Sequence, residues 1–285
     1  MSELARRVAV AVVGVPIVVG AVYAGQLPLA LFLGALGGLG AWELYRLARA
    51  TGLAPLESIG IPVAAAIPLY VVLNELGVLR SPAAIAAVTL LAMLGTTLWS
   101  RGPSGRPLES VAVTAFGAVY AGGMLAFVYL LRHHRFVSDR GAGTALVMYP
   151  VVLTWASDIG AYFVGRWFGH SKLMPTVSPG KTRAGAIGGL ALTVAASAAY
   201  NLWVLGPVAQ LALAPWTALV FGAVVSVAAQ VGDLVESMLK RQANVKDSSQ
   251  LLPGHGGILD RMDSLYFVLP VAHLVLSRLL VPAPR

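Results

Sequence analysis

Long apolar runs, separated by short polar or turn-forming segments, dominate the pattern along the chain. Each run approaches the roughly 20 residues that a helix needs to cross the hydrocarbon core of a bilayer. The pattern predicts about nine transmembrane helices. The runs fall at residues 6–24, 27–47, 58–76, 83–99, 109–131, 146–166, 184–204, 215–239 and 263–280. The predicted fold class is therefore all-α, a polytopic transmembrane helical bundle.

The composition indicates a single integral membrane domain over residues 1–285. Of the residues, 58% are hydrophobic and 11% are charged, whereas roughly a quarter are charged in an ordinary soluble domain. We interpret the run after Arg7 as a first membrane anchor rather than a signal peptide, because no small-residue cleavage site follows it. The chain has no Cys, which excludes disulfides and thiolate metal sites.

Basic residues, 20 against 12 acidic ones, report first on topology and on contact with anionic lipids. Nucleic-acid binding is not expected, because no polar domain carries a basic face. With the N-terminus in the cytoplasm, most Lys and Arg residues fall on the cytoplasmic side, and the main exception is the segment 132–145. The two longest polar segments, 167–183 and 240–262, then both face the cytoplasm.

Two aspartates lie inside predicted helices. Asp158 and Asp233 are each expected about 10–12 Å below the cytoplasmic end of their helix, so the two carboxylates share a level. A carboxylate at that depth costs at least about 2.5 kcal/mol, so it normally faces a polar cavity, a partner or an ion. A structural salt bridge and a transporter's proton relay remain open as alternatives.

The segment 233–263 adds a polar helix face and a glycine-rich loop. Helical spacing places the acidic residues deep and the basic residues at the mouth of one face. The glycines at 254, 256 and 257 allow the backbone to approach a phosphate, which their amides can cradle. Carboxylates near such a loop favour Mg²⁺ and phosphate chemistry. The alternative is a polar loop closed by helix-capping aspartates. The residues on the helix face are Asp233, Glu236, Ser237, Lys240 and Arg241.

The same segment resembles a known family signature. Ser237-Met-Leu-Lys-Arg241, Lys246-Asp247-Ser-Ser, Leu252-Pro-Gly-His-Gly-Gly257 and Asp260-Arg-Met-Asp263 together are similar to the signature of the CDP-diacylglycerol synthase (phosphatidate cytidylyltransferase) family. Asp158-Ile-Gly-Ala-Tyr162, Ser178-Pro-Gly-Lys-Thr182 and Trp42-Glu-Leu-Tyr45 resemble further elements of that family.

The resemblance implies a membrane enzyme of phospholipid biosynthesis whose partners are CTP, phosphatidate and membrane lipids, and it leaves a homodimer open. The expected location is the cell (inner) membrane, with the active site facing the cytoplasm and the catalytic part at about residues 146–285. The expected cofactor is Mg²⁺, as two divalent ions or as one divalent ion plus a second cation, with Asp233 and Asp260 as metal ligands.

The resemblance also assigns roles to individual residues. The expected catalytic residues are Asp158, Asp233, Lys240, Arg241, Asp260 and Asp263. The expected substrate-binding residues are Ser178, Lys181, Thr182, Ser237, Lys246, Asp247, His255, Gly256, Gly257 and Arg261.

One position departs from the family pattern, and two rival functions remain. Ala184 stands where the family commonly has Glu, which puts an acid of the site in doubt. A CTP-dependent polyprenol or phytol kinase would transfer the γ-phosphoryl group instead, but the His-Gly-Gly and Asp-Arg-x-Asp elements argue against it. A cation-coupled transporter would also bury aspartates, but it more often shows two related halves, and none is visible here.

Overall fold

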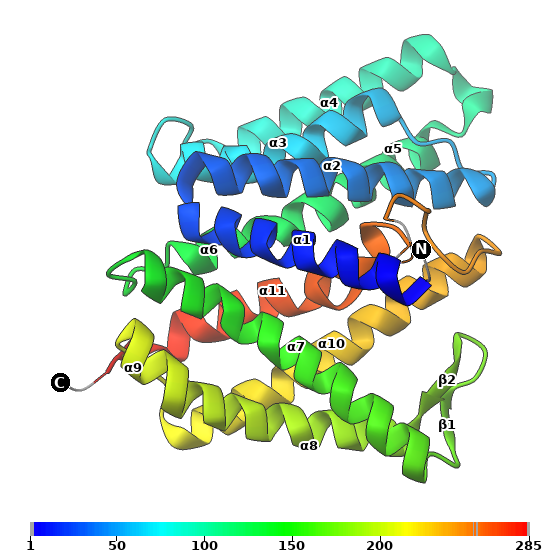
Figure 1. The fold of residues 1–285 in the computed structure, drawn as a ribbon. Helices are drawn as coiled ribbons and strands as arrows, with labels where there is room; N and C mark the ends of the chain where they lie inside the picture. The colour runs from blue at the N-terminus through cyan, green and yellow to red at the C-terminus, as the bar shows by residue number, and fades with distance from the viewer. Residues whose placement is uncertain (1–2, 253, 255, 284–285) are drawn as a thin grey trace. The chain divides into compact units, whose positions relative to one another are not determined.

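The computed structural model describes the backbone of residues 3–252, 254 and 256–283, and the side chains of these residues from position 12 onward. Within this part of the chain, eight helical stretches are long and apolar enough to cross a membrane (Figure 1). A further helix, α1 (Glu3–Ala24), contains the shorter apolar stretch Val12–Ala24. The all-α, polytopic architecture is thus confirmed. The eight stretches are Gln26–Ala50, Glu57–Glu75, Pro82–Ser100, Pro107–Arg132, Arg140–Phe168, Arg183–Ala209, Pro215–Gln242 and Leu259–Leu279.

Two of these stretches contain a π-helical turn, which divides them into shorter elements. Such turns are rare and occur mostly inside α-helices. The uninterrupted helices are α2 (Gln26–Ala50), α3 (Glu57–Glu75), α4 (Pro82–Ser100), α7 (Arg140–Phe168), α10 (Pro215–Gln242) and α11 (Leu259–Leu279). The divided stretches are α5 (Pro107–Ala118), η2 (Val119–Gly123) and α6 (Met124–Arg132), and α8 (Arg183–Tyr200), η3 (Asn201–Leu205) and α9 (Gly206–Ala209). A short 3-10 turn, η1 (Pro103–Gly105), precedes α5.

Local sequence explains where several helices begin. Pro82 and Pro107 occupy the first positions of α4 and α5, where a missing N–H is not costly. The Asp139 side chain accepts a hydrogen bond from the Ala142 N–H and caps α7. This cap extends the helix to Arg140, six residues before the expected start. Thr182 caps α8 in the same way.

The chain forms two compact units. The first consists of residues 1–14, 26–129 and 239–261, and the second consists of residues 15–25, 130–238 and 262–285. In the first unit, α2 packs along α3 (Figure 1). The Tyr45 hydroxyl donates a hydrogen bond to the carbonyl of Thr114 at 2.7 Å, and the Thr114 hydroxyl accepts one from the Leu56 N–H at 2.7 Å. These buried contacts tie α2 and the start of α3 to α5.

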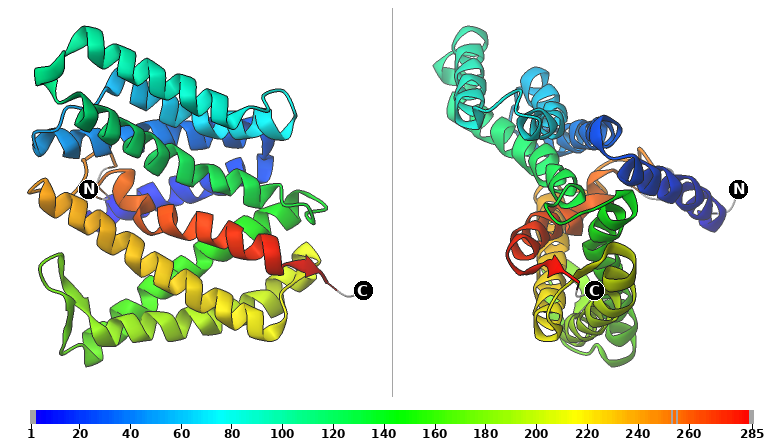
Figure 2. Two further views of the ribbon diagram at one scale, coloured as in Figure 1. Left: turned by 180° about the vertical axis from the view of Figure 1, so that it is seen from behind. Right: turned by 90° about the vertical axis from the view of Figure 1, so that its left-hand side faces the viewer.

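In the second unit, α7 and α8 pack against each other (Figures 1 and 2). Gly160 of α7 meets Gly188 of α8, where a Cβ on either residue would collide with the other's backbone. A hairpin of β1 (Lys172–Met174) and β2 (Ser178–Thr182) connects the two helices, with Lys172 opposite Thr182. The sequence predicts only a polar segment here. A second two-stranded pair joins β3 (Leu211–Ala212) to β4 (Val281–Pro282).

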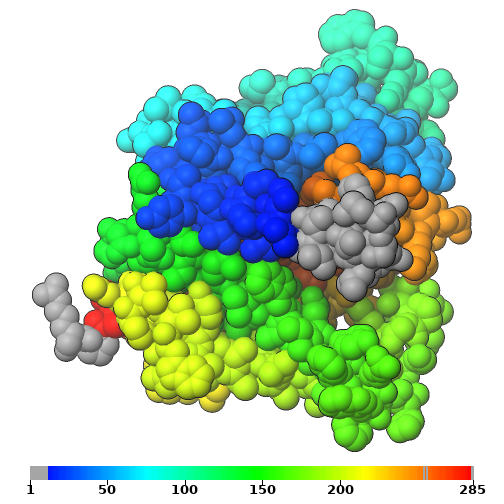
Figure 3. All heavy atoms as spheres, in the orientation of Figure 1, coloured from blue at the N-terminus to red at the C-terminus, as the bar shows by residue number. Residues whose placement is uncertain are grey.

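Many large apolar side chains are exposed rather than buried in a core. In α1, Val12, Val13 and Ile17 are more than half exposed, and the blue residues of this helix form part of the surface drawn in Figure 3. Such exposure is costly in water but matches a lipid environment, where no hydrophobic force drives helices together. The helical spans and their exposed apolar faces identify an integral membrane protein.

Candidate functional site

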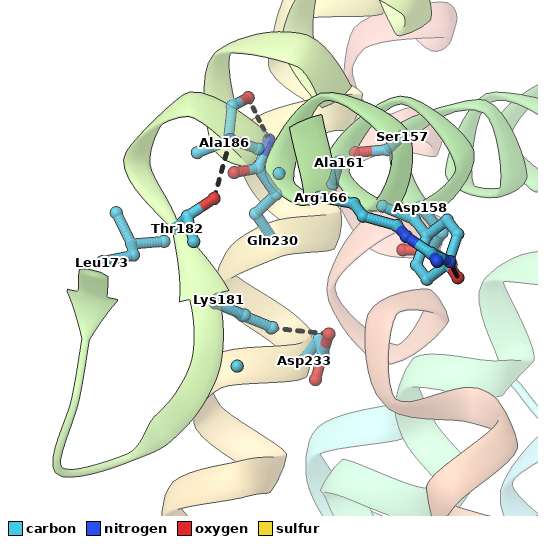
Figure 4. Close-up of a pocket in the computed structure, with 14 residues that line it drawn as sticks. Ser157, Asp158, Ala161, Arg166, Leu173, Lys181, Thr182, Ala186, Gln230 and Asp233 are labelled. Carbon is cyan, nitrogen blue, oxygen red and sulfur yellow. Dashed lines mark hydrogen bonds and ion pairs between the residues drawn. The ribbon is translucent and has the colours of Figure 1, made fainter. Parts of the chain in front are cut away.

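A pocket of about 440 Å³ opens in the second unit, among α7, the β1–β2 hairpin, the start of α8 and α10 (Figure 4). It contains the predicted site residues Asp158, Lys181, Thr182 and Asp233. Both helical aspartates therefore border the same cavity, and their role in one site stays a prediction. The other lining residues are Ser157, Ala161, Tyr162, Gly165, Arg166, Leu173, Gly180, Gly185, Ala186 and Gln230.

The charged side chains of the pocket are two acids, Asp158 and Asp233, and two bases, Arg166 and Lys181. Lys181 Nζ lies 2.5 Å from Asp233 Oδ2, and the Ser237 hydroxyl donates to Asp233 Oδ1 at 3.4 Å. Arg166 donates to the Tyr162 hydroxyl at 2.9 Å. Formal charges cancel in this set. A strongly anionic ligand therefore needs an additional cation, or the release of Lys181 from Asp233, before the pocket favours it electrostatically.

Small residues and caps hold the pocket walls in place. Thr182 accepts a hydrogen bond from the Gly185 N–H at 3.1 Å, which fixes the turn from β2 into α8. A Cβ on Gly185 would lie 2.7 Å from the carbonyl oxygen of Ala161, so only glycine allows α8 to approach α7 this closely. Gln230 of α10 donates to the carbonyl of Ala186 at 3.2 Å. The three helical walls are thus joined by contacts beside the charged residues.

Asp260 organises a second group of predicted residues, in the first unit. Its Oδ1 accepts a hydrogen bond from Lys240 Nζ at 2.6 Å. Its Oδ2 accepts bonds from the backbone N–H groups of Ser248 and Gly257, at 2.9 and 2.8 Å, and from the Ser248 hydroxyl at 2.8 Å. These contacts to one buried carboxylate hold Lys240, Ser248 and Gly257 at the start of α11.

Glu43 of α2, a residue without a predicted role, holds the other side of this loop. Its fully buried carboxylate accepts hydrogen bonds from the hydroxyls of Ser248 and Ser249, at 3.0 and 2.5 Å. It also accepts bonds from the backbone N–H groups of Ile258 and Leu259, at 3.0 and 2.7 Å. The sequence carried one signal for it, because Glu43 belongs to the family-like element Trp42-Glu-Leu-Tyr45.

The remaining predicted residues occupy varied positions. Ser178 lies on β2, outside the pocket lining, and Asp263 Oδ1 accepts a hydrogen bond from the Ser264 N–H at 2.6 Å. Gly256 has a φ of +81°, which favours glycine, and its carbonyl accepts a bond from the Leu252 N–H. His255 lies outside the described residues. The exposed predicted residues are Arg241, Lys246, Asp247 and Arg261.

The donor chemistry of the pocket fits Mg²⁺. No cluster of three or more His, Asp or Glu side chains is found among the residues that the structure describes, but Mg²⁺ is commonly held by one or two carboxylates together with substrate phosphates and water. Asp158 and Asp233 supply two such carboxylates in one pocket. Asp260 differs, because both of its oxygens already accept protein hydrogen bonds. Its role as a metal ligand stays a prediction.

Three known proteins with similar sequences are phosphatidate cytidylyltransferases. A phosphatidate cytidylyltransferase of Bacillus subtilis is 32% identical over 97% of this chain and 99% of its own length. A phosphatidate cytidylyltransferase of Pseudomonas aeruginosa is 38% identical over 94% of this chain and 95% of its own length. One of Haemophilus influenzae is 44% identical over about half of each chain. The model of the cytidylyltransferase family matches residues 5–279, and this chain belongs to that family.

Proposed function

We propose that this protein is a phosphatidate cytidylyltransferase, which converts CTP and phosphatidate into CDP-diacylglycerol and pyrophosphate in phospholipid biosynthesis. The observation that carries the proposal is the pocket in which Asp158, Asp233, Arg166 and Lys181 meet at membrane-spanning helices of a cytidylyltransferase-family chain. Relatives that match nearly the whole chain bear the same name.

The reaction needs alignment and charge neutralisation more than it needs a protein nucleophile. A phosphate oxygen of phosphatidate forms a bond to the α-phosphorus of CTP, and the bond from that phosphorus to the oxygen bridging to the β-phosphorus breaks. Pyrophosphate leaves with the bonding electron pair. Both substrates are polyanions, so cationic groups that meet the charge of the transition state provide the main catalytic effect.

Different residues of the pocket would bind the nucleotide phosphates and the metal ion. Lys181 and Arg166 would meet CTP phosphates, while Asp158 and Asp233 would hold Mg²⁺. When bound, Mg²⁺ neutralises phosphate charge and orients the α-phosphorus. The ion pair between Lys181 and Asp233 keeps the carboxylate compensated before substrate arrives, and it separates when Lys181 turns toward a phosphate.

We further propose that the pocket faces the cytoplasm, in the cell (inner) membrane, and that phosphatidate enters sideways from the lipid. CTP is too polar to enter the bilayer, whereas the acyl chains of phosphatidate leave it only at high cost. Asp158 is exposed on α7 beside exposed Trp155, Ile159 and Tyr162. A carboxylate on such an apolar surface supports a lateral opening through which a lipid phosphate reaches the charged residues.

The decisive experiment uses purified protein in lipid micelles with CTP labelled at either the α- or the γ-phosphate. Cytidylyl transfer moves the α-label into a lipid product that depends on phosphatidate, and releases the γ-label as pyrophosphate. A polyprenol or phytol kinase would place the γ-label in the lipid. A transporter would label no lipid at all. Either of these last results would refute the proposal.

A further inference from the structure

We propose that Glu43 is a positioning residue for this reaction. Its carboxylate fixes the two ends of the glycine-rich loop, residues 248–249 and 257–259, and through them the side chains of Asp260 and Lys240. Glu43 lies on α2, more than 200 residues before the loop in sequence. The inference rests on the proposed function for its kinetic consequence, but its structural part can be tested without any assay of turnover.

The four donors to Glu43 come from both ends of the loop. Ser248 and Ser249 donate hydroxyls from its first residues, and Ile258 and Leu259 donate backbone N–H groups where α11 begins. The first N–H groups of a helix have no partner within the helix and carry partial positive charge. Glu43 therefore caps α11 from a distant helix and fixes both ends of the loop at once.

Close packing leaves the loop little freedom around Glu43. A Cβ on Gly257 would overlap with the carboxylate of Glu43 and the hydroxyl of Ser248. The backbone at this position is therefore pressed against the acid. A shift of the Glu43 carboxylate requires the backbone of Gly257 to shift, and the Gly257 N–H is one of the donors to Asp260.

Ser248 connects Glu43 to Asp260 directly. Its hydroxyl oxygen lies 3.0 Å from Glu43 Oε2 and 2.8 Å from Asp260 Oδ2, and because it has one proton it donates to one of the two carboxylates at a time. Asp260 in turn accepts the hydrogen bond of Lys240 at 2.6 Å. Glu43 thereby acts on two predicted catalytic side chains through one hydroxyl and one glycine backbone. We do not expect it to touch either substrate.

Stability alone does not account for an acid at this position. A buried carboxylate is costly to desolvate, and apolar packing of similar volume often serves a helix interface as well or better. Tyr45, two residues further along α2, already ties this helix to α5 through its hydroxyl. What the carboxylate adds is acceptor sites on two oxygens for the loop's donors, of which the Ser248 hydroxyl is shared with Asp260.

A buried reporter in the loop tests the structural part. Ile258 is 6% exposed, and the chain has no native Cys, so Ile258→Cys introduces a single protected thiol while the backbone N–H remains. In membranes, maleimide should label this thiol slowly. Adding Glu43→Gln, which preserves volume but places an amide against the donors, should accelerate labelling at least tenfold. Tyr45→Phe, which removes a buried hydrogen bond between the same helix and α5, should change the labelling rate less than twofold.

Kinetics test the consequence for the reaction. Glu43→Gln should lower kcat/KM for CTP by tenfold or more, while Tyr45→Phe stays within twofold of the parent. Equal effects of the two variants on labelling or on kcat/KM would reduce Glu43 to a general packing residue and overturn the proposal. If Glu43→Gln fails to fold, Ser249→Ala removes the hydrogen bond from the Ser249 hydroxyl to Glu43 instead. This variant must still accelerate maleimide labelling of the thiol introduced by Ile258→Cys. A parent that transfers no cytidylyl group would refute the proposed function, while the labelling result would stand independently.

Discussion

Replacement of Asp233 by Asn separates nucleotide binding from turnover. The change preserves the size of the side chain and removes one negative charge from a pocket whose acids and bases are balanced, Asp158 and Asp233 against Arg166 and Lys181. The variant pocket therefore carries one net positive charge. It also lacks a carboxylate that we propose for Mg²⁺, and the ion pair with Lys181 is lost.

Removing the negative charge strengthens CTP binding, whereas losing the proposed metal ligand slows turnover. The loss of turnover is the larger effect. Two unit charges 4 Å apart interact by about 1 kcal/mol in water and about 4 kcal/mol at an effective dielectric of 20. The Asp233 charge is partly screened by solvent and by its ion pair with Lys181, so its net repulsion of an anion falls between these limits, and removing it strengthens Mg²⁺-free CTP binding about fivefold or more. Loss of a group that supports charge stabilisation in the transition state typically lowers kcat by about 10²–10³.

The assay combines equilibrium binding of labelled CTP in EDTA with steady-state turnover over a range of Mg²⁺ concentrations. We expect unchanged or tighter CTP binding in EDTA together with a loss of kcat of about 10²–10³ in Mg²⁺. Asp247→Asn, in an exposed loop position, makes the same chemical change outside the pocket and should lower turnover less than Asp233→Asn does. Normal turnover of Asp233→Asn with unchanged Mg²⁺ dependence would refute the metal assignment.

Three further predictions address the hairpin, the topology and a buried histidine. Lys181→Met should raise the KM for CTP about tenfold by removing a phosphate contact worth about 1.4 kcal/mol, whereas Lys172→Met, exposed and outside the pocket lining, should change it less than twofold. Single cysteines at Met174 and Gln250 should react with an impermeant maleimide from the cytoplasmic side only, and one at Ser81 from the opposite side only; all three positions are exposed, and the reverse pattern would overturn the orientation. Burial, and then the charges of Arg135 and His273, lower the pKa of His134. The unfolded chain therefore binds more protons at this site, so thermal stability should decline as the pH falls below about 6.5, and His134→Gln should flatten that decline.

Membrane spans could be predicted from sequence because the physical signal is strong. Each expected run coincides with a helix or with helical elements joined by a π turn. The ends were less certain, because they depend on single side chains rather than on average hydropathy. At α7, the cap by Asp139 moves the start to Arg140, into a stretch of small residues that the hydropathy pattern did not distinguish from a loop.

The β1–β2 hairpin shows a different limit of sequence reasoning. Its residues, Lys172–Met174 and Ser178–Thr182, carry no alternation of apolar and polar positions and include a proline and a glycine, so no strand signal exists. The hairpin forms because α7 and α8 pack side by side and the chain must return between their ends. Lys181 reaches Asp233 as a result of this connection, which local sequence does not encode.

The pocket and the loop differ in how much of each could be predicted. The sequence places Asp158 and Asp233 at a similar depth, because rise per residue converts position in a helix directly into distance, and both line the pocket. Glu43 was not assigned a role, because a helical acid near the end of an apolar run looks the same whether it faces water or a buried loop. Only the hydrogen bonds from the loop distinguish the two.

The glycines of the loop illustrate how one sequence feature admits two physical explanations. Gly-rich turns with nearby aspartates indicate a backbone that approaches an anion closely, and that anion was expected to be a phosphate. At Gly257 the structure shows protein carboxylates in this place: the N–H binds Asp260, and the missing side chain makes room for Glu43. The sequence indicates an anion near these glycines; at Gly257 the tertiary structure supplies two protein carboxylates, and phosphate binding by the loop stays a prediction. Because two protein carboxylates already occupy the space around Gly257, this glycine is required for the loop to fold even before any phosphate binds.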